Sequence, residues 1–391
     1  MWFPTPRLLI FMLLYLCSLP GMAQEEEELW LLVPDQKQRL RQAVEQYQAL
    51  ADSASWHTFP STLLLRPGDS SRYVPPLQET LQLLGDWVAE DSENRHQYTP
   101  ALAAAVVRFQ ARHALKPDGI VGPRTVAALN RPPAQRLLQL QNSLSRWEAF
   151  SKDISQPYIL VNIPDYSLRV IDHSAVLLDM RTIVGKPAQP TLVNQTDLHT
   201  IVFNPYWYIP NSIASKEILP ILKRNPGYLA KRDMQLLKPA VLGGYTKIDP
   251  WQVNWSKVDA SGFNFRVVQV AGEQNELGKV KFLFHSNVNQ YLHDTNDRHL
   301  FDLDRRAFSH GCIRLQHPHE LAQYLMQERS GLTEKRAERF LTTDKDEQFV
   351  RLKKPVPILI VYMTAWADPH LGLQFREDIY GYDQPKQVTM E

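Results

Sequence analysis

The sequence has 391 residues, with 43 Lys and Arg against 42 Asp and Glu, and therefore a formal net charge of +1. This near-balance argues against nucleic acid as the main partner, because binding to phosphates requires an excess of basic groups on one face. Charged residues make up 22% of the chain, close to the roughly 25% of ordinary globular proteins, which excludes wholesale disorder. The length predicts two or three domains of roughly 100–200 residues each.

The first residues have the order of a secretory signal peptide. Arg7 precedes an apolar run at residues 8–19, and Pro20, Gly21 and Ala23 follow it, so we expect residues 1–23 to be removed. The run is shorter than the ~20 residues that a membrane-spanning helix needs, so no membrane anchor is expected in the mature form. Removal would take away one basic and no acidic residue, which leaves 42 of each sign.

The cysteine count changes with the signal peptide. The sequence contains two cysteines, Cys17 and Cys312, and only Cys312 would remain after cleavage. An exported compartment normally oxidises thiols into pairs. A solitary cysteine there is either a buried apolar residue or a thiol used for chemistry.

The N-terminal third of the mature sequence is predicted to be helical. Residues 24–72 form a helical or scaffold segment, with Leu40, Val44 and Tyr47 on one face of a helix. Residues 73–131 predict a small all-α domain of three helices, the second opened by Pro100 and the third by Pro123. Residues 132–152 then predict a linker helix.

One segment of this helical part carries a family pattern. Residues 105–130, AVVRFQARHALKPDGIVGPRTVAALN, resemble the peptidoglycan-binding repeat of three-helix cell-wall modules. The matching positions are Ala105, Phe109, Gln110, Leu115, Asp118, Gly119, Gly122, Thr125 and Leu129. The resemblance implies that this domain binds the cell-wall polymer, although a module of this kind can also serve only to pack against a neighbour.

From residue 153 to residue 366 the pattern changes to strands. Residues 158–171, 175–185, 199–210, 264–272, 280–285 and 358–366 have strand-like alternation, with a hairpin turn at residues 172–174. Residues 211–262 interrupt this pattern with helical or irregular sequence, and such a long excursion is usually a lid or a binding loop. Residues 367–391 are expected to be a C-terminal tail.

The residues around Cys312 form a chemical pattern. Ser309, His310 and Gly311 precede the thiol and Arg314 follows it, while His293 lies about twenty residues upstream. The thiolate is the nucleophilic form of cysteine, and a nearby His can take its proton. A small Gly beside the nucleophile lets backbone N–H groups approach an oxyanion, and Arg can orient a carboxylate. The residues alone leave His293 and His310 both open as the base.

The block SHGCIRL, preceded by HDT, resembles the YkuD-type catalytic domain of L,D-transpeptidases. Together with the stretch at residues 203–217, it is most similar to the large Gram-negative subgroup that carries a peptidoglycan-binding module and a capping insert. The implied fold is α+β and multidomain: a mostly-β catalytic domain with a helical capping insert at residues 211–262, plus the all-α module. The chain before the module is shorter than in the long members of that subgroup.

The resemblance also assigns roles to residues. Cys312 is the implied nucleophile and His293 the general base, with His310, Gly311 and Arg314 completing the catalytic set. An oxyanion would be held by the N–H groups of Cys312 and Gly311. The expected substrate contacts are Tyr291, Ser309, Asp294, Thr295, Trp207 and Tyr206.

The implied activity is formation of 3–3 peptidoglycan cross-links in the periplasm, through a thioester from a tetrapeptide donor stem, with release of D-Ala. Peptidoglycan stem peptides and glycan are the expected partners, carbapenems the expected inhibitors, and no cofactor is needed. Two alternatives remain open: a thiol carboxypeptidase or endopeptidase of the same fold, and a non-catalytic wall-binding protein. A zinc site is disfavoured, because the histidines near Cys312 lack the paired Cys or H-E-x-x-H spacing.

Overall fold

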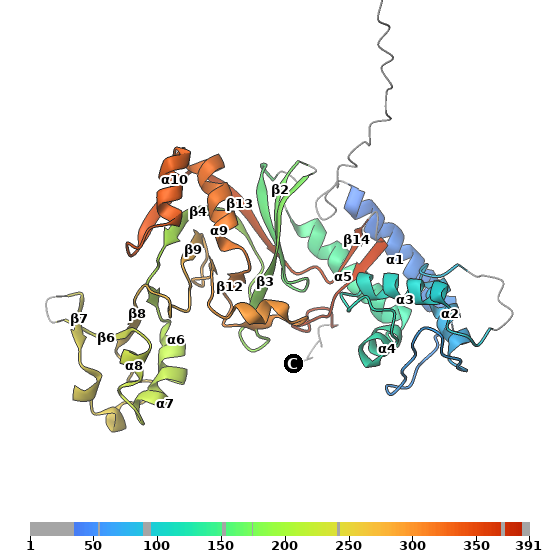
Figure 1. Cartoon of the computed structure of the whole chain (residues 1–391), viewed down its shortest axis with the longest axis horizontal. Helices are drawn as coiled ribbons and strands as arrows, with labels where there is room; N and C mark the ends of the chain where they lie inside the picture. Colours follow the sequence, from blue (N-terminus) through green and yellow to red (C-terminus); the bar gives the residue numbers. More distant parts are fainter. Residues whose placement is uncertain are drawn as a thin grey trace, which may run out of the picture.

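The computed structural model describes residues 35–53, 55–88, 95–150, 154–173, 175–240, 243–368 and 372–384. The expected signal peptide lies outside these residues. Within these ranges, none of the helices has both the length and the apolar character needed to cross a bilayer. A strongly curved sheet occupies the centre of the molecule, with a helical part at one end and a smaller mixed part at the other (Figure 1).

The three predicted helices of the N-terminal domain are α2 (Val74–Leu83), α3 (Pro100–Arg112) and α4 (Pro123–Leu129). Each has a proline in its first turn, where the missing N–H costs no helical hydrogen bond. The side-chain amide of Gln110 donates to Asp118, to the Ile120 carbonyl and to Thr125, and so fixes the turn between α3 and α4. The apolar core of this domain also contains Phe59, Leu63 and Leu65, so the domain begins upstream of residue 73.

Two further helices pack against each other beside this domain. They are α1 (Asp35–Ser53) and α5 (Pro133–Ala149), and Leu40, Tyr47 and Leu140 are buried between them and Phe375. The segment predicted as a linker is therefore part of a packed helical layer. Gln36 on α1 also exchanges hydrogen bonds with the backbone of Ala367, which ties the start of the described chain to its end.

The central sheet has nine strands in the order β11-β3-β12-β10-β9-β4-β13-β1-β2, and β2 also pairs with β3, which closes the sheet into a barrel-like form. The strands are β1 (Tyr158–Asn162), β2 (Ser167–Asp172), β3 (Ala175–Gly185), β4 (Asn194–Phe203), β9 (Val280–Phe284), β10 (Leu292–His293), β11 (Ala307–Ser309), β12 (Ile313–Leu315) and β13 (Gln348–Val361). The strand expected at residues 358–366 begins ten residues earlier, because β13 runs the full length of β4.

Of the segment expected to be a C-terminal tail, the described residues 367–368 and 372–384 belong to the folded structure. A two-stranded sheet forms from β14 (Ala365–Asp368) and β15 (Gly372–Phe375). Arg376 then donates to Asp165 at 2.6 Å, and the Tyr380 hydroxyl donates to the carbonyl of Gly185 at 2.7 Å. These contacts correct the prediction of a tail, because Ile379 is buried in the main hydrophobic core and Phe375 is buried beside α1 and α5.

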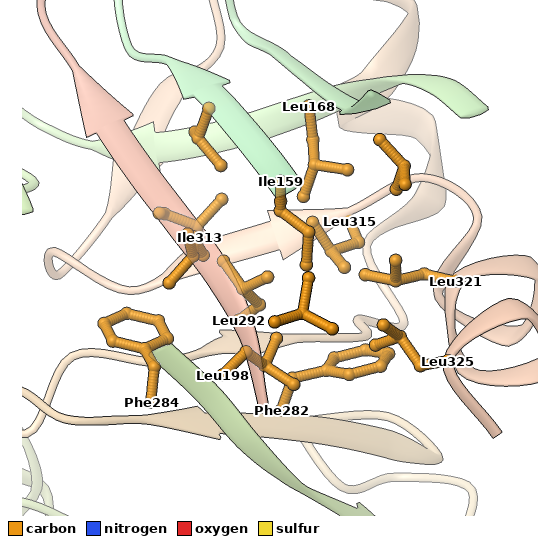
Figure 2. Close-up of a cluster of buried hydrophobic side chains, with 14 of the residues drawn as sticks. Ile159, Leu168, Leu198, Phe282, Phe284, Leu292, Ile313, Leu315, Leu321 and Leu325 are labelled. Atoms are coloured by element: carbon orange, nitrogen blue, oxygen red, sulfur yellow. The ribbon is translucent and has the colours of Figure 1, made fainter. Parts of the chain in front are cut away.

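One face of the sheet packs on the main hydrophobic core. Figure 2 shows Phe282, Leu292 and Ile313 from three adjacent strands together with Leu321 and Leu325. The two leucines come from α9 (Pro318–Leu325), which continues as η5 (Met326–Ser330) and is followed by α10 (Glu334–Leu341). Side chains alternate between the two faces of a strand, so the neighbours of these core residues lie on the opposite face.

The predicted insert is a mixed subdomain and not only a helical or irregular one. Its helical elements are α6 (Asn211–Ile213), η1 (Ala214–Ile218), α7 (Leu219–Leu222), α8 (Tyr228–Lys231), η2 (Pro250–Gln252) and η3 (Trp255–Lys257). They accompany a four-stranded sheet of β5 (Trp207–Tyr208), β8 (Arg266–Gln269), β6 (Met234–Pro239) and β7 (Tyr245–Ile248). We call residues 207–269 the insert subdomain. The alternation at residues 264–272 correctly indicated a strand, but that strand pairs within this subdomain.

Candidate active site

The sheet face opposite the main core carries a row of basic side chains. Lys281 on β9 pairs with His293 on β10, and His293 pairs with Arg314 on β12. Residues that pair directly across strands project to the same face, so these three side chains share one surface. Tyr291 precedes His293 by two residues and Cys312 precedes Arg314 by two, which places both in the adjacent row.

These residues line a cleft of about 870 Å³ between the central sheet and the insert subdomain. The sheet and its loops contribute Pro190, Lys281, Tyr291, His293, Ser309, His310, Gly311, Cys312 and Arg314. The insert subdomain contributes Trp207, Tyr208, Ser212, Ile213, Glu217, Ile221 and Tyr228. The cleft volume falls within the usual range for ligand sites. Polar side chains of the cleft surround Cys312, the only cysteine among the described residues.

Cys312 lies at the floor of the cleft and is held as a thiol. Its Sγ lies 3.9 Å from the carbonyl oxygen of Asn289, which can accept the thiol hydrogen. Burial raises the pKa of Cys312 above its ordinary value, and hydrogen bonds from the backbone and side chain of Tyr291 act in the opposite direction. Smaller contributions from Lys281 and Arg314 also favour the thiolate. The sulfur is therefore protonated at rest, with groups already in place to stabilise its anion.

His293 is the buried histidine of the cleft, with 5% of its surface exposed. Its Nδ1 lies 2.5 Å from the backbone oxygen of Asp294, so Nδ1 carries the proton and Nε2 has the free lone pair. Burial lowers the pKa of His293 to about 3, and the charges of Arg314 and Lys281 act in the same direction. The imidazole is therefore neutral and oriented as a proton acceptor.

The loop before Cys312 is shaped by an unusual backbone conformation. Gly311 has φ +110°, a region that residues with a Cβ rarely adopt. The N–H of Gly311 donates to Ser309 Oγ at 3.1 Å, and Ser309 Oγ in turn donates to the Cys312 carbonyl. The carbonyl of Gly311 accepts from Thr191 Oγ1 at 2.9 Å. This corrects the expectation that the Gly311 N–H holds an oxyanion, since that N–H is already engaged. Ser309 accordingly orders the loop from a buried position.

Arg314 and His310 have acidic partners. Arg314 donates to Asp297 Oδ2 at 2.8 Å, while its Nε is buried without a partner among the described residues. His310 Nε2 lies 2.7 Å from Glu217 Oε1, a residue of η1 in the insert subdomain. His310 therefore connects the loop of the cysteine to the insert subdomain, whereas the buried His293 has the free nitrogen. The geometry favours His293 over His310 as the base.

Three expected substrate contacts lie outside the cleft. Asp294 follows His293 on the chain and so points to the opposite face, where it accepts from Lys279 N and from Arg298. Thr295 is buried, and its hydroxyl accepts from the N–H of Asp297. Tyr206 donates to Asp346 at 2.9 Å, away from the cleft lining. Alternation accounts for Asp294 and Tyr206, because their neighbours His293 and Trp207 are the ones that face the cleft. Thr295 lies beyond the end of β10, where the strand pattern no longer holds.

Sequence reasoning missed three lining residues with charged side chains: Lys281, Glu217 and Glu276. Lys281 belongs to the alternating segment at residues 280–285, and its position on the polar face was the available signal. Glu217 gave no signal, because only tertiary packing brings η1 to the loop before Cys312. In the part of the chain that the structure describes, no group of three or more His, Cys, Asp or Glu residues is arranged to hold a metal ion.

Comparisons with protein families agree with this arrangement. Residues 156–358 match the family described as "L,D-transpeptidase catalytic domain" and include every cleft residue named above. Residues 72–129 match the family described as "Putative peptidoglycan binding domain".

One curated relative and several solved structures are similar to this chain. A curated protein of Haemophilus influenzae, described as "Putative L,D-transpeptidase", is 34% identical over 226 residues, which are 58% of this chain and 44% of that protein. The match thus spans less than half the length of that relative. An L,D-transpeptidase structure from Xylanimonas cellulosilytica is 14% identical, covers 79% of this chain and all of that one, and has a TM-score of 0.22.

Two other solved structures show the same type of similarity. An L,D-transpeptidase from Mycobacterium smegmatis is 12% identical, with a TM-score of 0.24, over 52% of this chain and 59% of that one. An LD transpeptidase in complex with imipenem is 13% identical, with a TM-score of 0.22, over 52% of this chain and 57% of that one.

Proposed function

The chain belongs to the L,D-transpeptidase catalytic-domain family, and from this premise we propose that it cross-links peptidoglycan through a thioester on Cys312. The observation that carries the proposal is that one cleft is lined both by the hydrogen-bonded thiol of Cys312 and by the neutral imidazole of His293, whose Nε2 has no hydrogen-bond partner among the described residues. The donor is a tetrapeptide stem, the bond formed is of the 3–3 type, and the site of action is the periplasm.

In the first half-reaction, Cys312 attacks the carbonyl at the L-centre of the diamino acid in the donor stem. His293 Nε2 accepts the thiol proton as the S–C bond forms and then delivers it to the nitrogen of the departing D-Ala. Because the resting pair is thiol and neutral imidazole, proton transfer accompanies attack and does not precede it. A thioester on Cys312 and free D-Ala result.

The oxyanion of the tetrahedral intermediate needs hydrogen-bond donors. The N–H of Cys312 has no partner among the described residues, and the Tyr291 hydroxyl loses its role at sulfur once the S–C bond forms. These two donors are the groups that we assign to the oxyanion. Trp207 also hydrogen-bonds the oxygen of Tyr291 and keeps that hydroxyl directed into the cleft.

In the second half-reaction, the side-chain amine of an acceptor stem attacks the thioester carbonyl while His293 accepts a proton from that amine. The C–S bond then breaks, and His293 returns the proton to the sulfur of Cys312. Water competes for the same intermediate. The insert subdomain forms one wall of the cleft through Trp207, Ile213 and Glu217, and we assign it the role of limiting water at the thioester. The helical domain is assigned to binding the wall polymer near this cleft.

The test is a reaction of the purified protein with tetrapeptide-rich muropeptides, with the products identified by mass. Cross-linked dimers and free D-Ala support the proposal, whereas tripeptide monomers alone identify a thiol carboxypeptidase. A Cys312→Ala variant with an unchanged circular dichroism spectrum is expected to lose both products and to form no covalent adduct with a carbapenem. An adduct on that variant would contradict the assignment of the nucleophile.

A further inference from the structure

Most charged side chains that line the cleft have a counter-charge within the protein. Arg314 pairs with Asp297, Glu217 with His310, and Glu276 with Arg232 at 3.3 Å. Lys281 forms no ion pair within 4 Å among the described residues. Its ammonium instead lies 3.9 Å from the centre of the Tyr291 ring. Among the described residues of the cleft, the ammonium of Lys281 is therefore a cation that faces the Tyr291 ring and the cleft itself, without an anionic partner.

A partly buried ammonium without a counter-ion is unfavourable, because burial removes water that nothing replaces. The pKa of Lys281 is lowered by this burial, while the negative charges of Glu347 and of Cys312 in its thiolate form act in the opposite direction. An anionic group of a ligand would provide the missing hydrogen-bond acceptor and relieve the cost. The position of Lys281 thus has the character of an anion-binding subsite, and Tyr291 lies between it and the nucleophile Cys312.

A role limited to stabilising the Cys312 thiolate fits less well. The pKa of Cys312 remains raised in the presence of Lys281, and the direct hydrogen bonds to the sulfur come from Tyr291. Lys281 also lies one strand further from Cys312 than His293 does, since β9 and β12 flank β10 on opposite sides. Its donors are therefore free for a ligand that spans the row from β12 to β9.

We propose that Lys281 binds a carboxylate of the donor stem peptide and selects donors that carry this charge beside the scissile bond. The inference rests on the proposed function. Two of the carboxylates of a tetrapeptide stem are the candidates that flank the scissile bond: the terminal carboxylate of the departing D-Ala and the carboxylate at the D-centre of the diamino acid. A donor extended by a further residue loses the first of these.

The experiment compares three synthetic donors: the free acid, the C-terminal amide, and the form amidated at the diamino acid. Wild type, Lys281→Met and Lys281→Arg are measured with each donor. Loss of one charge-assisted hydrogen bond predicts that K281M raises KM for the free acid roughly 10- to 100-fold with little change in kcat. K281R should recover most of the effect. With wild type, one amidated donor should have a KM as high as the KM of the free acid with K281M. The carboxylate that is amidated in that donor is the one that Lys281 binds.

A matched control removes the same charge elsewhere. Lys279 lies two residues before Lys281 and pairs with Glu273 at 2.6 Å outside the cleft, so Lys279→Met should leave KM unchanged for all donors. If K281M raised KM equally for all three donors, or changed kcat alone, the inference would be overturned.

Direct binding separates this inference from the proposed function. Calorimetry on Cys312→Ala measures donor affinity without turnover. The added K281M substitution should weaken binding of the donors that retain the bound carboxylate and leave the affinity of the third donor unchanged. If C312A binds acid and amides equally, the inference fails even when the wild type makes cross-links. If the wild type makes no product but C312A binds the acid through Lys281, the proposed function fails and the inference stands.

Discussion

The imidazole of His310 and the carboxylate of Glu217 lie 2.7 Å apart, and this contact joins the loop of the nucleophile to the insert subdomain. The two residues are 93 positions apart in the chain. Both side chains are partly exposed, at 30% and 48%, so the pair contributes at most about 1 kcal/mol to closure of the cleft. A contact of this strength can hold the cleft closed and still release it during turnover.

The first prediction concerns this contact. Glu217→Ala removes the partner of His310, and we expect the ratio of hydrolysis to cross-linking to rise, by up to about fivefold for a loss of 1 kcal/mol. The ratio is measured by mass analysis of muropeptide products. Glu273→Ala removes an exposed acidic residue outside the cleft and should leave the ratio unchanged. An unchanged ratio in Glu217→Ala would contradict the closing role.

The second prediction concerns the thiol. Tyr291→Phe removes a hydrogen bond to sulfur, so the pKa of Cys312 should rise further, by about 1–2 pH units for a charge-assisted bond. The pH profile of alkylation by iodoacetamide reports this pKa. Tyr245→Phe, on an exposed strand of the insert subdomain, serves as the control. Coincident profiles for wild type and Tyr291→Phe would show that the hydroxyl does not act on the sulfur.

The third prediction links His293 to stability. Its pKa is about 3 in the folded protein and 6.5 ordinarily, so the unfolded chain binds one more proton between these values. The free energy of unfolding should therefore fall as pH decreases from 6.5 towards 3, by about 1.4 kcal/mol per pH unit from this residue. Urea titrations at several pH values should give a shallower dependence for His293→Gln than for wild type. Parallel curves would show that His293 is not held neutral.

The fourth prediction concerns the junction of the helical domain with the C-terminal segment. The buried pair of Arg112 and Asp86 joins the end of helix α3 to the loop after α2, and Arg112 also donates to the carbonyl of Leu373 at 2.7 Å. Asp86→Ala leaves a buried charge without its partner and should cost about 3–5 kcal/mol of unfolding free energy. Asp304→Ala breaks the exposed pair with Arg124 and should cost less than about 1 kcal/mol. Equal losses in urea denaturation would contradict this ranking.

Local sequence patterns predicted the helices and strands in which apolar residues recur at regular spacing. The three helices around Leu81, Phe109 and Leu129 follow from apolar spacing and prolines at the helix starts, and the strands at residues 158–185 follow from alternation. The insert subdomain was predicted only in part, because β6 and β7 are short and partly exposed and have little apolar alternation. The C-terminal segment was misjudged because the contacts that fix it, such as Arg376 with Asp165 and Tyr380 with Gly185, join residues that are far apart in the chain.

By itself, the sequence determined the chemistry available to this protein: one cysteine outside the predicted signal peptide, its neighbours from Ser309 to Arg314, and an upstream His293. Local residue types carry that information. The tertiary structure decided which groups can act together. Strand pairing placed Lys281, His293 and Arg314 in one row, turned Asp294 away, and engaged the Gly311 N–H with Ser309. Packing alone brought Glu217 to His310, because contacts across 93 residues have no local sequence pattern to indicate them.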